Sequence, residues 1–318
     1  MKKILLSVFA AAALASCIQN EDINPLTPIG FGDAFVNNST KAIYEGSEEV
    51  DSFQVWGAYK GISATTWAEL YNGSIVTRPN DLTGYNAAKA WNCDDKRYWA
   101  DDCNYKFYAV VDDADATTVT ADKGVVKSIN FTANGSNDLL YGYKEENTKD
   151  AIPALVAFEM NHLLSKISFK FTAHEKLLAG YTYQVNSVTV ADAFATGVYN
   201  VADNGTGSWA SQKDAMAALT LTVPATAIKA TEFVAANGAY VIIPGKAPLK
   251  ITIEAQLLFN GSDYGPAETF NIELTGTKAV DFQKGYHYAF NVILPTPENT
   301  IDFTIQKVNG FVDVPTNL

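Results

Sequence analysis

The chain has 318 residues, of which 47% are hydrophobic and 18% charged, and its formal net charge is −12. This apolar fraction excludes an intrinsically disordered chain, and the length is typical of two domains. The charge also argues against nucleic acid as a partner, because binding to phosphate backbones needs a basic surface. Here acidic residues outnumber basic ones by 35 to 23, and the only arginines are Arg78 and Arg97.

The first 16 residues have the pattern of a signal peptide. Lys2 and Lys3 precede an apolar run at 4–14, and small residues lead directly to Cys17. A run of roughly eleven residues is too short to cross a hydrocarbon core of ~30 Å. The Leu-Ala-Ser-Cys sequence at 14–17 resembles the bacterial lipobox, in which the cysteine is acylated and becomes the first mature residue. We therefore expect a lipid on Cys17 and an anchor in the outer membrane; the alternative is an ordinary secretory signal with an incidental cysteine.

Two further cysteines, Cys93 and Cys103, lie close together in the sequence. Outside the cytoplasm such a pair can oxidise, and a disulfide that closes a short loop stabilises a fold by ~2–3 kcal/mol. We therefore predict a disulfide between them. A metal site is the alternative, because Asp94, Asp95, Asp101 and Asp102 lie nearby, although zinc sites usually have more closely paired ligands or histidines.

Most of the chain has the pattern of β-strands. Apolar and polar residues alternate with a period of two in several runs, which are separated by Asn-Gly turns; the clearest runs are 167–171, 219–223, 251–253, 287–294 and 301–306. Short strands at this spacing favour antiparallel β-sandwiches. Only 65–70 and 211–218 have the pattern of short helices. A polar stretch at 174–180 predicts the boundary between two domains.

The sequence has none of the common catalytic motifs. It has no nucleophile elbow, zinc-protease helix or nucleotide-binding glycine loop, and its three histidines, His162, His174 and His287, lie in or beside strand patterns. We therefore expect neither an enzyme nor a protein that needs a cofactor.

The order of several segments resembles the fimbrillin family of Bacteroidetes, the FimA- and Mfa-like subunits of surface pili. The segments that carry the resemblance are SFQVWG at 52–57, YW at 98–99, YKFYA at 105–109, DLLYG at 138–142, FEMNHLLSKI at 158–167, VIIP at 241–244, GYHY at 285–288 and the closing stretch 301–313. From the first segment to the last, they span most of the chain after the signal peptide.

The resemblance implies two tandem transthyretin-like β-sandwich domains, here at 42–176 and 177–318, after a lipidated segment at 17–41. It also implies assembly by strand exchange, in which a protease removes an N-terminal strand and a neighbouring subunit supplies another. Apolar residues at 29–36 suit the removable strand, and Lys41-Ala42 follows where many relatives have arginine before alanine. A lysine-specific or trypsin-like protease would then be needed; the alternative is that 40–42 is only a linker. The donor strand would come from 301–312 or from a rearrangement of the chain.

We therefore predict a structural or accessory subunit of a surface fimbrium that serves cell adhesion. Its expected partners are other fimbrial subunits and a ligand on a host or bacterial surface. The alternative is a monomeric surface lipoprotein that binds glycans or proteins, for which exposed tryptophans would be the sign, because an indole ring can stack on a sugar. The five candidates are Trp56, Trp67, Trp91, Trp99 and Trp209.

Overall fold

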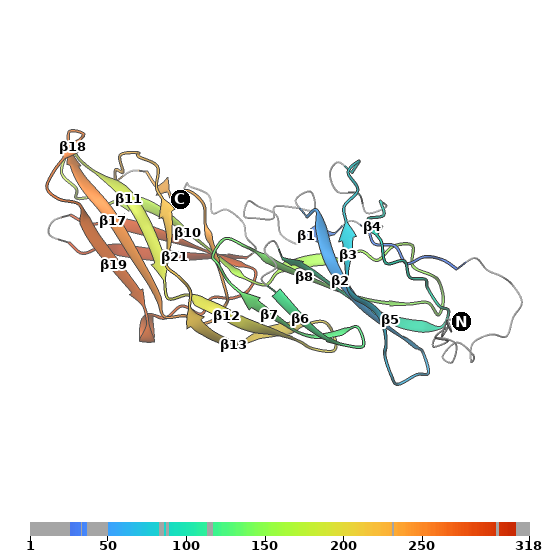
Figure 1. The fold of residues 1–318 in the computed structure, drawn as a ribbon. Coiled ribbons are helices and arrows are strands. Elements are labelled where there is room, and N and C mark those ends of the chain that lie inside the picture. Colours follow the sequence, from blue (N-terminus) through green and yellow to red (C-terminus); the bar gives the residue numbers. More distant parts are fainter. Residues whose placement is uncertain are drawn as a thin grey trace, which may run out of the picture.

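The computed structural model describes residues 26–32, 34–36, 50–82, 86, 89–112, 117–230, 232–296 and 299–309. The predicted signal peptide at 1–16, Cys17, Lys41 and Ala42 lie outside the described residues. Within them the fold is all-β, as predicted, and the one helical element is a 3₁₀ turn, Gly276–Lys278 (Figure 1). No described segment forms a helix with the length and hydrophobicity of a membrane span.

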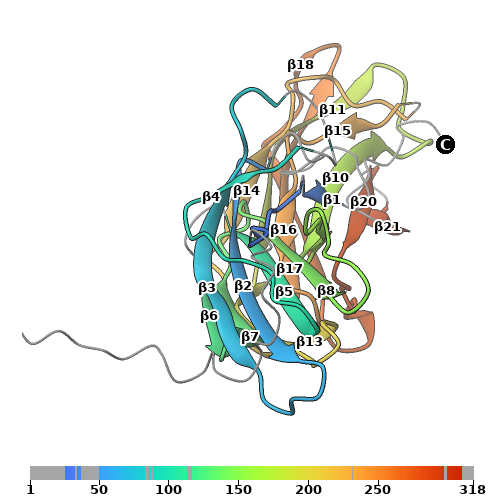
Figure 2. The same ribbon diagram turned by 90° about the vertical axis from the view of Figure 1, so that its right-hand side faces the viewer.

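The first sandwich is built on a seven-stranded sheet whose central strands lie side by side in Figure 2. All its neighbouring strands are antiparallel except the pair β1 and β9, which is parallel. In spatial order the strands are β1 (Phe35–Val36), β9 (Glu159–His162), β8 (Leu139–Asn147), β5 (Cys103–Asp112), β2 (Ser52–Gly61), β3 (Ala68–Thr77) and β4 (Asn92–Cys93).

A four-stranded sheet forms the second layer of this sandwich. Its order is β13 (Gly207–Ala215), β12 (Phe194–Val201), β7 (Val125–Thr132) and β6 (Thr117–Asp122). The core between the two layers contains Trp56 and Tyr108 from the large sheet and Ile129, Phe131 and Tyr199 from the small one.

The second sandwich has two five-stranded sheets. One contains β15 (Val234–Ala235), β10 (Ser165–Ala173), β20 (Tyr286–Leu294) and β21 (Asp302–Asn309), with β16 (Tyr240–Ile242) also paired to β10. The other contains β14 (Leu219–Thr222), β11 (Tyr181–Ala191), β17 (Leu249–Phe259) and β18 (Ser262–Asp263), with β19 (Glu268–Leu274) also paired to β17. The expectation of two β-sandwiches therefore agrees with the structure.

The strand pairing does not follow the predicted division at 176–177. β10 lies inside the predicted first domain but pairs with β20 and belongs to the second sandwich. The hairpin of β12 and β13 lies in the predicted second domain but extends the small sheet of the first sandwich by pairing with β7. Only two residues separate β9 from β10, so the sequence shows no polar break where the chain passes from one sandwich to the other.

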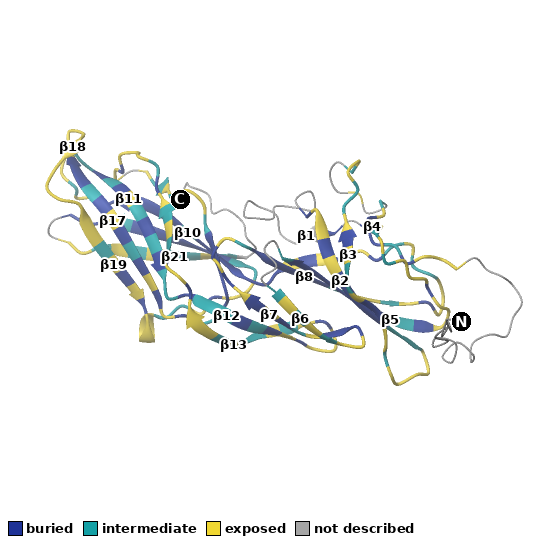
Figure 3. Cartoon of the chain, viewed as in Figure 1, coloured by how far each residue is buried: buried dark blue, intermediate teal, exposed yellow. Residues whose placement is uncertain are grey.

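The seven-stranded sheet is covered on both of its faces. Successive side chains of a strand point to opposite faces, and Tyr108 of β5 lies in the core toward the small sheet whereas Phe107 lies in a separate core on the other face. β5 is consequently buried along most of its length (Figure 3), which explains its nearly continuous run of apolar residues. The second face is the one that positions the candidate site.

Candidate functional site: the groove that holds the N-terminal segment

The residues at 26–36, here called the N-terminal segment, lie against this second face. Phe31 bridges to both Trp91 and Val156. Its carbonyl oxygen accepts a hydrogen bond from Trp91 N at 2.8 Å, while Val156 N donates to Gly30 O and Gly32 N donates to Val156 O, each at 2.8 Å. The segment is therefore held by backbone hydrogen bonds on two sides, as an added strand would be.

Backbone contacts continue toward both ends of the segment. Trp99 N donates to Thr27 O at 3.0 Å and Ile29 N donates to Arg97 O at 2.8 Å. At the other end, β1 runs parallel to β9, with Phe35 opposite Glu159. The N-terminal segment thus passes from the stretch around 91–99 to the edge of the seven-stranded sheet.

The side chain of Phe31 is the centre of the contact. It is 0% exposed, and four aromatic rings lie around it, with centroids at 6.0 Å for Phe53, 5.5 Å for Tyr71, 6.2 Å for Phe107 and 6.2 Å for Phe158. Full burial of a phenylalanine contributes about 1.5–3 kcal/mol, and favourable aromatic pairs add about 0.5–1.5 kcal/mol each. One side chain therefore accounts for much of the energy that holds the segment.

Gly30 allows the backbone to come close to the wall of the groove. A Cβ atom at this position would lie 2.7 Å from Cδ2 of Leu155, which is closer than non-bonded carbons can approach without a shift. Ile29 and Ala34, on either side, are buried as well. A larger residue in place of Gly30 would therefore require the Leu155 side chain to move, while the groove buries apolar residues on both sides of the glycine.

The two tyrosines in the walls of the groove are neutral at neutral pH. Burial raises the pKa of Tyr71 well above its ordinary value and that of Tyr105 to about 12, so both phenols stay protonated. Trp91 and Trp99 complete the rim, with ring centroids 5.4 Å from Phe53 and 5.8 Å from Phe107. An apolar strand is the occupant that such a surface favours.

Sequence patterns pointed to the apolar stretch at 29–36 but not to its partners. Tyr71 comes from β3, Trp91 from the residues before β4, and Val156 and Phe158 from the residues before β9. Only the strand order brings these three parts of the chain together. The one sequence feature that indicates the walls of the groove is the high density of aromatic residues at 91–108.

The predicted disulfide is not present in the structure, where Cys93 and Cys103 are not bonded to each other. Cys93 lies opposite Val76, which itself lies opposite Phe53 of β2, whereas Cys103 lies opposite Gly61 at the far end of β2. Eight residues of extended strand separate these positions by about 26 Å, and a disulfide needs Cα atoms within about 7 Å. The prediction was wrong because the loop between the cysteines crosses the sheet instead of turning back on itself.

No metal site replaces the disulfide in the part of the chain that the structure describes. Its acidic, cysteine and histidine side chains form no cluster of three or more with the spacing of a metal site. The side chain of Asp95 instead accepts hydrogen bonds from Ser74 Oγ at 2.8 Å and from Arg97 Nη2 at 3.2 Å.

Both thiols are expected to resist alkylation in the native protein. Cys103 is buried, and burial raises the pKa of Cys93, which reduces the reactive thiolate. After denaturation without a reductant, iodoacetamide should modify both residues, as peptide mass spectrometry would show. A peptide pair joined through Cys93 and Cys103 would contradict the strand register.

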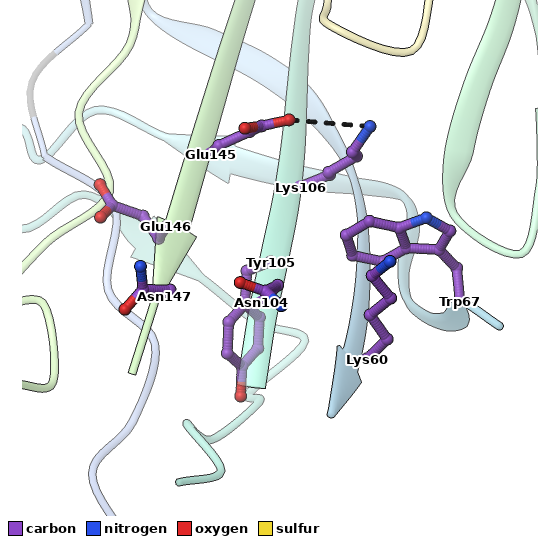
Figure 4. A pocket seen from close by; sticks show the side chains of 8 residues that line it. All are labelled: Lys60, Trp67, Asn104, Tyr105, Lys106, Glu145, Glu146 and Asn147. Atoms are coloured by element: carbon purple, nitrogen blue, oxygen red, sulfur yellow. Dashed lines mark ion pairs between the residues drawn. The ribbon is translucent and has the colours of Figure 1, made fainter. Parts of the chain in front are cut away.

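A second candidate site is a polar pocket of about 400 Å³ at the ends of β2, β5 and β8 (Figure 4). Lys60 Nζ lies 4.7 Å and Lys106 Nζ 5.2 Å from the centroid of the Trp67 ring, and Lys106 Nζ lies 3.7 Å from Glu145 Oε1. The pocket is lined by Lys60, Trp67, Asn104, Tyr105, Lys106, Glu145, Glu146 and Asn147. An aromatic ring among amides and charged groups can hold a polar ligand with an apolar face.

The other tryptophans have structural contacts. Trp56, Trp91 and Trp99 are buried in the cores. Trp209 is half-buried; its Nε1 donates to Leu163 O at 2.7 Å, and its ring packs beside Tyr199. Trp67 is the tryptophan that fits the glycan-binding alternative.

The buried histidines take part in hydrogen bonds between strands. His162 Nδ1 lies 2.5 Å from Asp138 Oδ2, and His287 Nε2 lies 2.7 Å from Ser168 Oγ. Both contacts are inside the sheets that build the two sandwiches, which agrees with a structural role.

Comparison with known proteins places this architecture in a family. A family model described as fimbrillin-like matches residues 40–307. The fold resembles a fimbrial protein from Bacteroides vulgatus, with a TM-score of 0.68 and 15% identity over 89% of this chain and 99% of that chain. It also resembles candidate cell adhesion proteins from Bacteroides uniformis and Bacteroides ovatus, each with a TM-score of 0.56 and 14% identity over 91% of this chain and 99% of the other.

A comparison with curated proteins gives no match. At 14–15% identity the solved structures show a shared fold, whereas the family model covers well over half of the chain. The resemblance seen in the order of the sequence segments is confirmed: the chain belongs to the fimbrillin-like family.

Proposed function

We propose that this chain is a subunit of a surface fimbrium, and that it assembles when its N-terminal segment is replaced by a strand from a neighbouring subunit. Membership of the fimbrillin-like family supports a fimbrial role at the cell surface. The observation that carries the proposal is the position of Phe31, a fully buried core residue only ten residues before Lys41.

Loss of the segment would leave the groove incomplete in two ways. Trp91 N and Val156 N would lose their acceptors, and unpaired buried backbone groups cost about 1–3 kcal/mol each. The pocket among Phe53, Tyr71 and Phe107 would also open to water. A strand from another subunit would restore both kinds of contact, which is the physical basis of assembly by β-strand addition.

The lipid on Cys17 would then deliver the precursor to the outer membrane. Cleavage after Lys41 would separate the lipidated segment from the chain that begins at Ala42 and release that chain for assembly. With lysine in place of the usual arginine, the protease would be lysine-specific or trypsin-like. Without cleavage, Cys17 would remain a permanent anchor, and the chain would be a base component or a stand-alone surface lipoprotein.

The proposal is tested on the groove itself. The chain that begins at Ala42 should bind a labelled peptide of residues 26–36, measured by fluorescence polarisation, because the peptide restores the missing strand. A matched peptide with Phe31→Ala should bind at least about tenfold more weakly, since it lacks the anchoring side chain. If neither peptide binds to the folded chain, the segment is not exchangeable and the proposal fails.

Glycan binding at the Trp67 pocket is the second candidate function, and the position of Trp67 among polar side chains favours it. On an array of host and bacterial glycans, Trp67→Ala should lower binding by about tenfold, which corresponds to ~1.4 kcal/mol. Tyr264→Ala is the control, because Tyr264 is an exposed aromatic residue in the second sandwich. Equal binding by the two variants would remove the pocket from consideration.

A further inference from the structure

Lys60 gives the Trp67 pocket a positive charge that pairs with no carboxylate among the described residues. Its Nζ lies 4.7 Å from the centroid of the Trp67 ring, and an indole face attracts a cation at this distance. The other lysine of the pocket, Lys106, is only 8% exposed; its Nζ lies 3.7 Å from Glu145 Oε1 and donates a hydrogen bond to Asp203 O. Lys60 is therefore the cation of the pocket that can pair with a ligand.

The two carboxylates of the pocket already have cations beside them. Glu145 pairs with Lys106, and Glu146 Oε1 lies 3.5 Å from Lys144 Nζ. These two pairs balance each other in charge, so the ammonium group of Lys60 leaves the pocket with an excess positive charge. The chain as a whole has a formal net charge of −12, and a local positive charge on such a surface favours an anionic group at that place.

Two asparagine side chains lie in line with Lys60 (Figure 4). In the register of the sheet, Lys60 of β2 is opposite Asn104 of β5, which is in turn opposite Asn147 of β8. Opposite residues point to the same face, and neighbouring strands are about 4.8 Å apart, so the row spans roughly 10 Å. Asn147 Oδ1 accepts a hydrogen bond from Lys149 N at 3.2 Å, which leaves its amide N–H groups to donate. The row thus has an ammonium group at one end and amide groups along the rest.

From this arrangement we infer that the Trp67 pocket binds a sugar that carries a carboxylate, a uronic or a sialic acid. The carboxylate pairs with Lys60, which Trp67 holds in place, and the sugar hydroxyls bond to the amides of Asn104 and Asn147, since an amide can both donate and accept. The pocket volume of about 400 Å³ is in the range of small-molecule sites. The inference rests on the proposed binding of glycans at this pocket and adds the chemical class of the sugar.

The charges of the pocket favour a ligand with a single negative group. Glu145 and Glu146 line the pocket together with the row of Lys60, Asn104 and Asn147. A second negative charge on the ligand would lie near these carboxylates and would be repelled by them. A phosphate or a densely sulfated chain is therefore disfavoured, whereas a sugar acid presents one carboxylate to Lys60 and neutral hydroxyls to the rest of the site.

Two pairs of oligosaccharides test the inference, because the members of each pair differ in one carboxylate. One pair is a trisaccharide that ends in glucuronic acid and its counterpart that ends in glucose; the other is sialyllactose and its methyl ester. Calorimetric titration of the soluble precursor, with Cys17→Ser, should show that an acidic member binds at least about tenfold more tightly than its neutral partner, as expected for a hydrogen bond between charged groups. The pair with the larger ratio identifies the acid as uronic or sialic.

A substitution at Lys60 separates its charge from the rest of the pocket. Lys60→Met keeps a long side chain but removes the ammonium group, so the acidic sugar should bind only as tightly as the neutral one. Lys96→Met is the matched control, because Lys96 is an exposed lysine that does not line the pocket, and it should keep the full preference for the acid. Thermal melts should show that both variants remain folded.

The possible results distinguish the inference from the proposed glycan site. Equal binding of the acidic and neutral sugars by the unsubstituted chain would overturn the inference, and so would a preference that survives Lys60→Met; the glycan site stands in both cases if Trp67→Ala weakens binding. If no sugar binds, the glycan site and the inference fail together. A tetraglutamate peptide that binds more tightly than either acidic sugar would indicate an acidic protein as the ligand and would also overturn the inference.

Discussion

Phe31→Ala is expected to lower the free energy of unfolding of the precursor by about 3–5 kcal/mol, the usual cost of removing a large aromatic side chain from a core. The side chain is 0% exposed, and its ring lies against those of Phe53, Tyr71, Phe107 and Phe158. Urea unfolding of a soluble precursor, with Cys17→Ser to prevent lipidation, would measure the change.

Leu26→Ala is the control for this measurement. Leu26 belongs to the same N-terminal segment but is 69% exposed, so its replacement should change the free energy of unfolding by no more than about 0.5 kcal/mol. Equal effects of the two substitutions would mean that the groove does not depend on Phe31.

Trypsin is expected to cut the folded precursor after Lys41 and to convert monomers into higher oligomers. Before cleavage the N-terminal segment is tethered, and its high effective concentration keeps the groove occupied. After cleavage it can dissociate, and a strand from another subunit can replace it. Size-exclusion chromatography with light scattering, together with the mass of the cut chain, would follow both steps.

Two substitutions at the same residue control this experiment. Lys41→Ala removes the trypsin site and should leave the precursor monomeric, whereas Lys41→Arg keeps a trypsin site and should behave like the original chain. Lys41→Arg should also resist a protease that cuts only after lysine. A chain that stays monomeric after clean removal of residues 17–41 would contradict self-assembly by strand exchange.

The sequence predicted the class of the fold because its strands alternate strongly. β17, for example, has buried residues at alternate positions along most of its length, and this period is visible in the sequence alone. The two predicted short helices were wrong. Residues 211–215 belong to β13 and residues 68–70 to β3. In β13, Ser211 and Asp214 have positive φ angles of 54° and 60°, so irregular strand geometry interrupts the alternation there.

The candidate site was predictable only in part. The apolar stretch at 29–36 precedes Lys41 in the sequence, and this order suggested a removable strand. The walls of the groove come from β2, β3, β5 and the residues before β9, and a single sequence does not give the order of strands in a sheet. For the same reason Cys93 and Cys103, close in sequence, lie far apart along β2.

Assembly by strand exchange requires that the N-terminal segment is removed from the subunit. Mass spectrometry of this chain in purified surface appendages tests it most directly, because the mass of the first peptide identifies the mature N-terminus. Strand exchange after cleavage predicts chains that begin at Ala42. Appendages built from chains that begin at a lipidated Cys17 would contradict the claim.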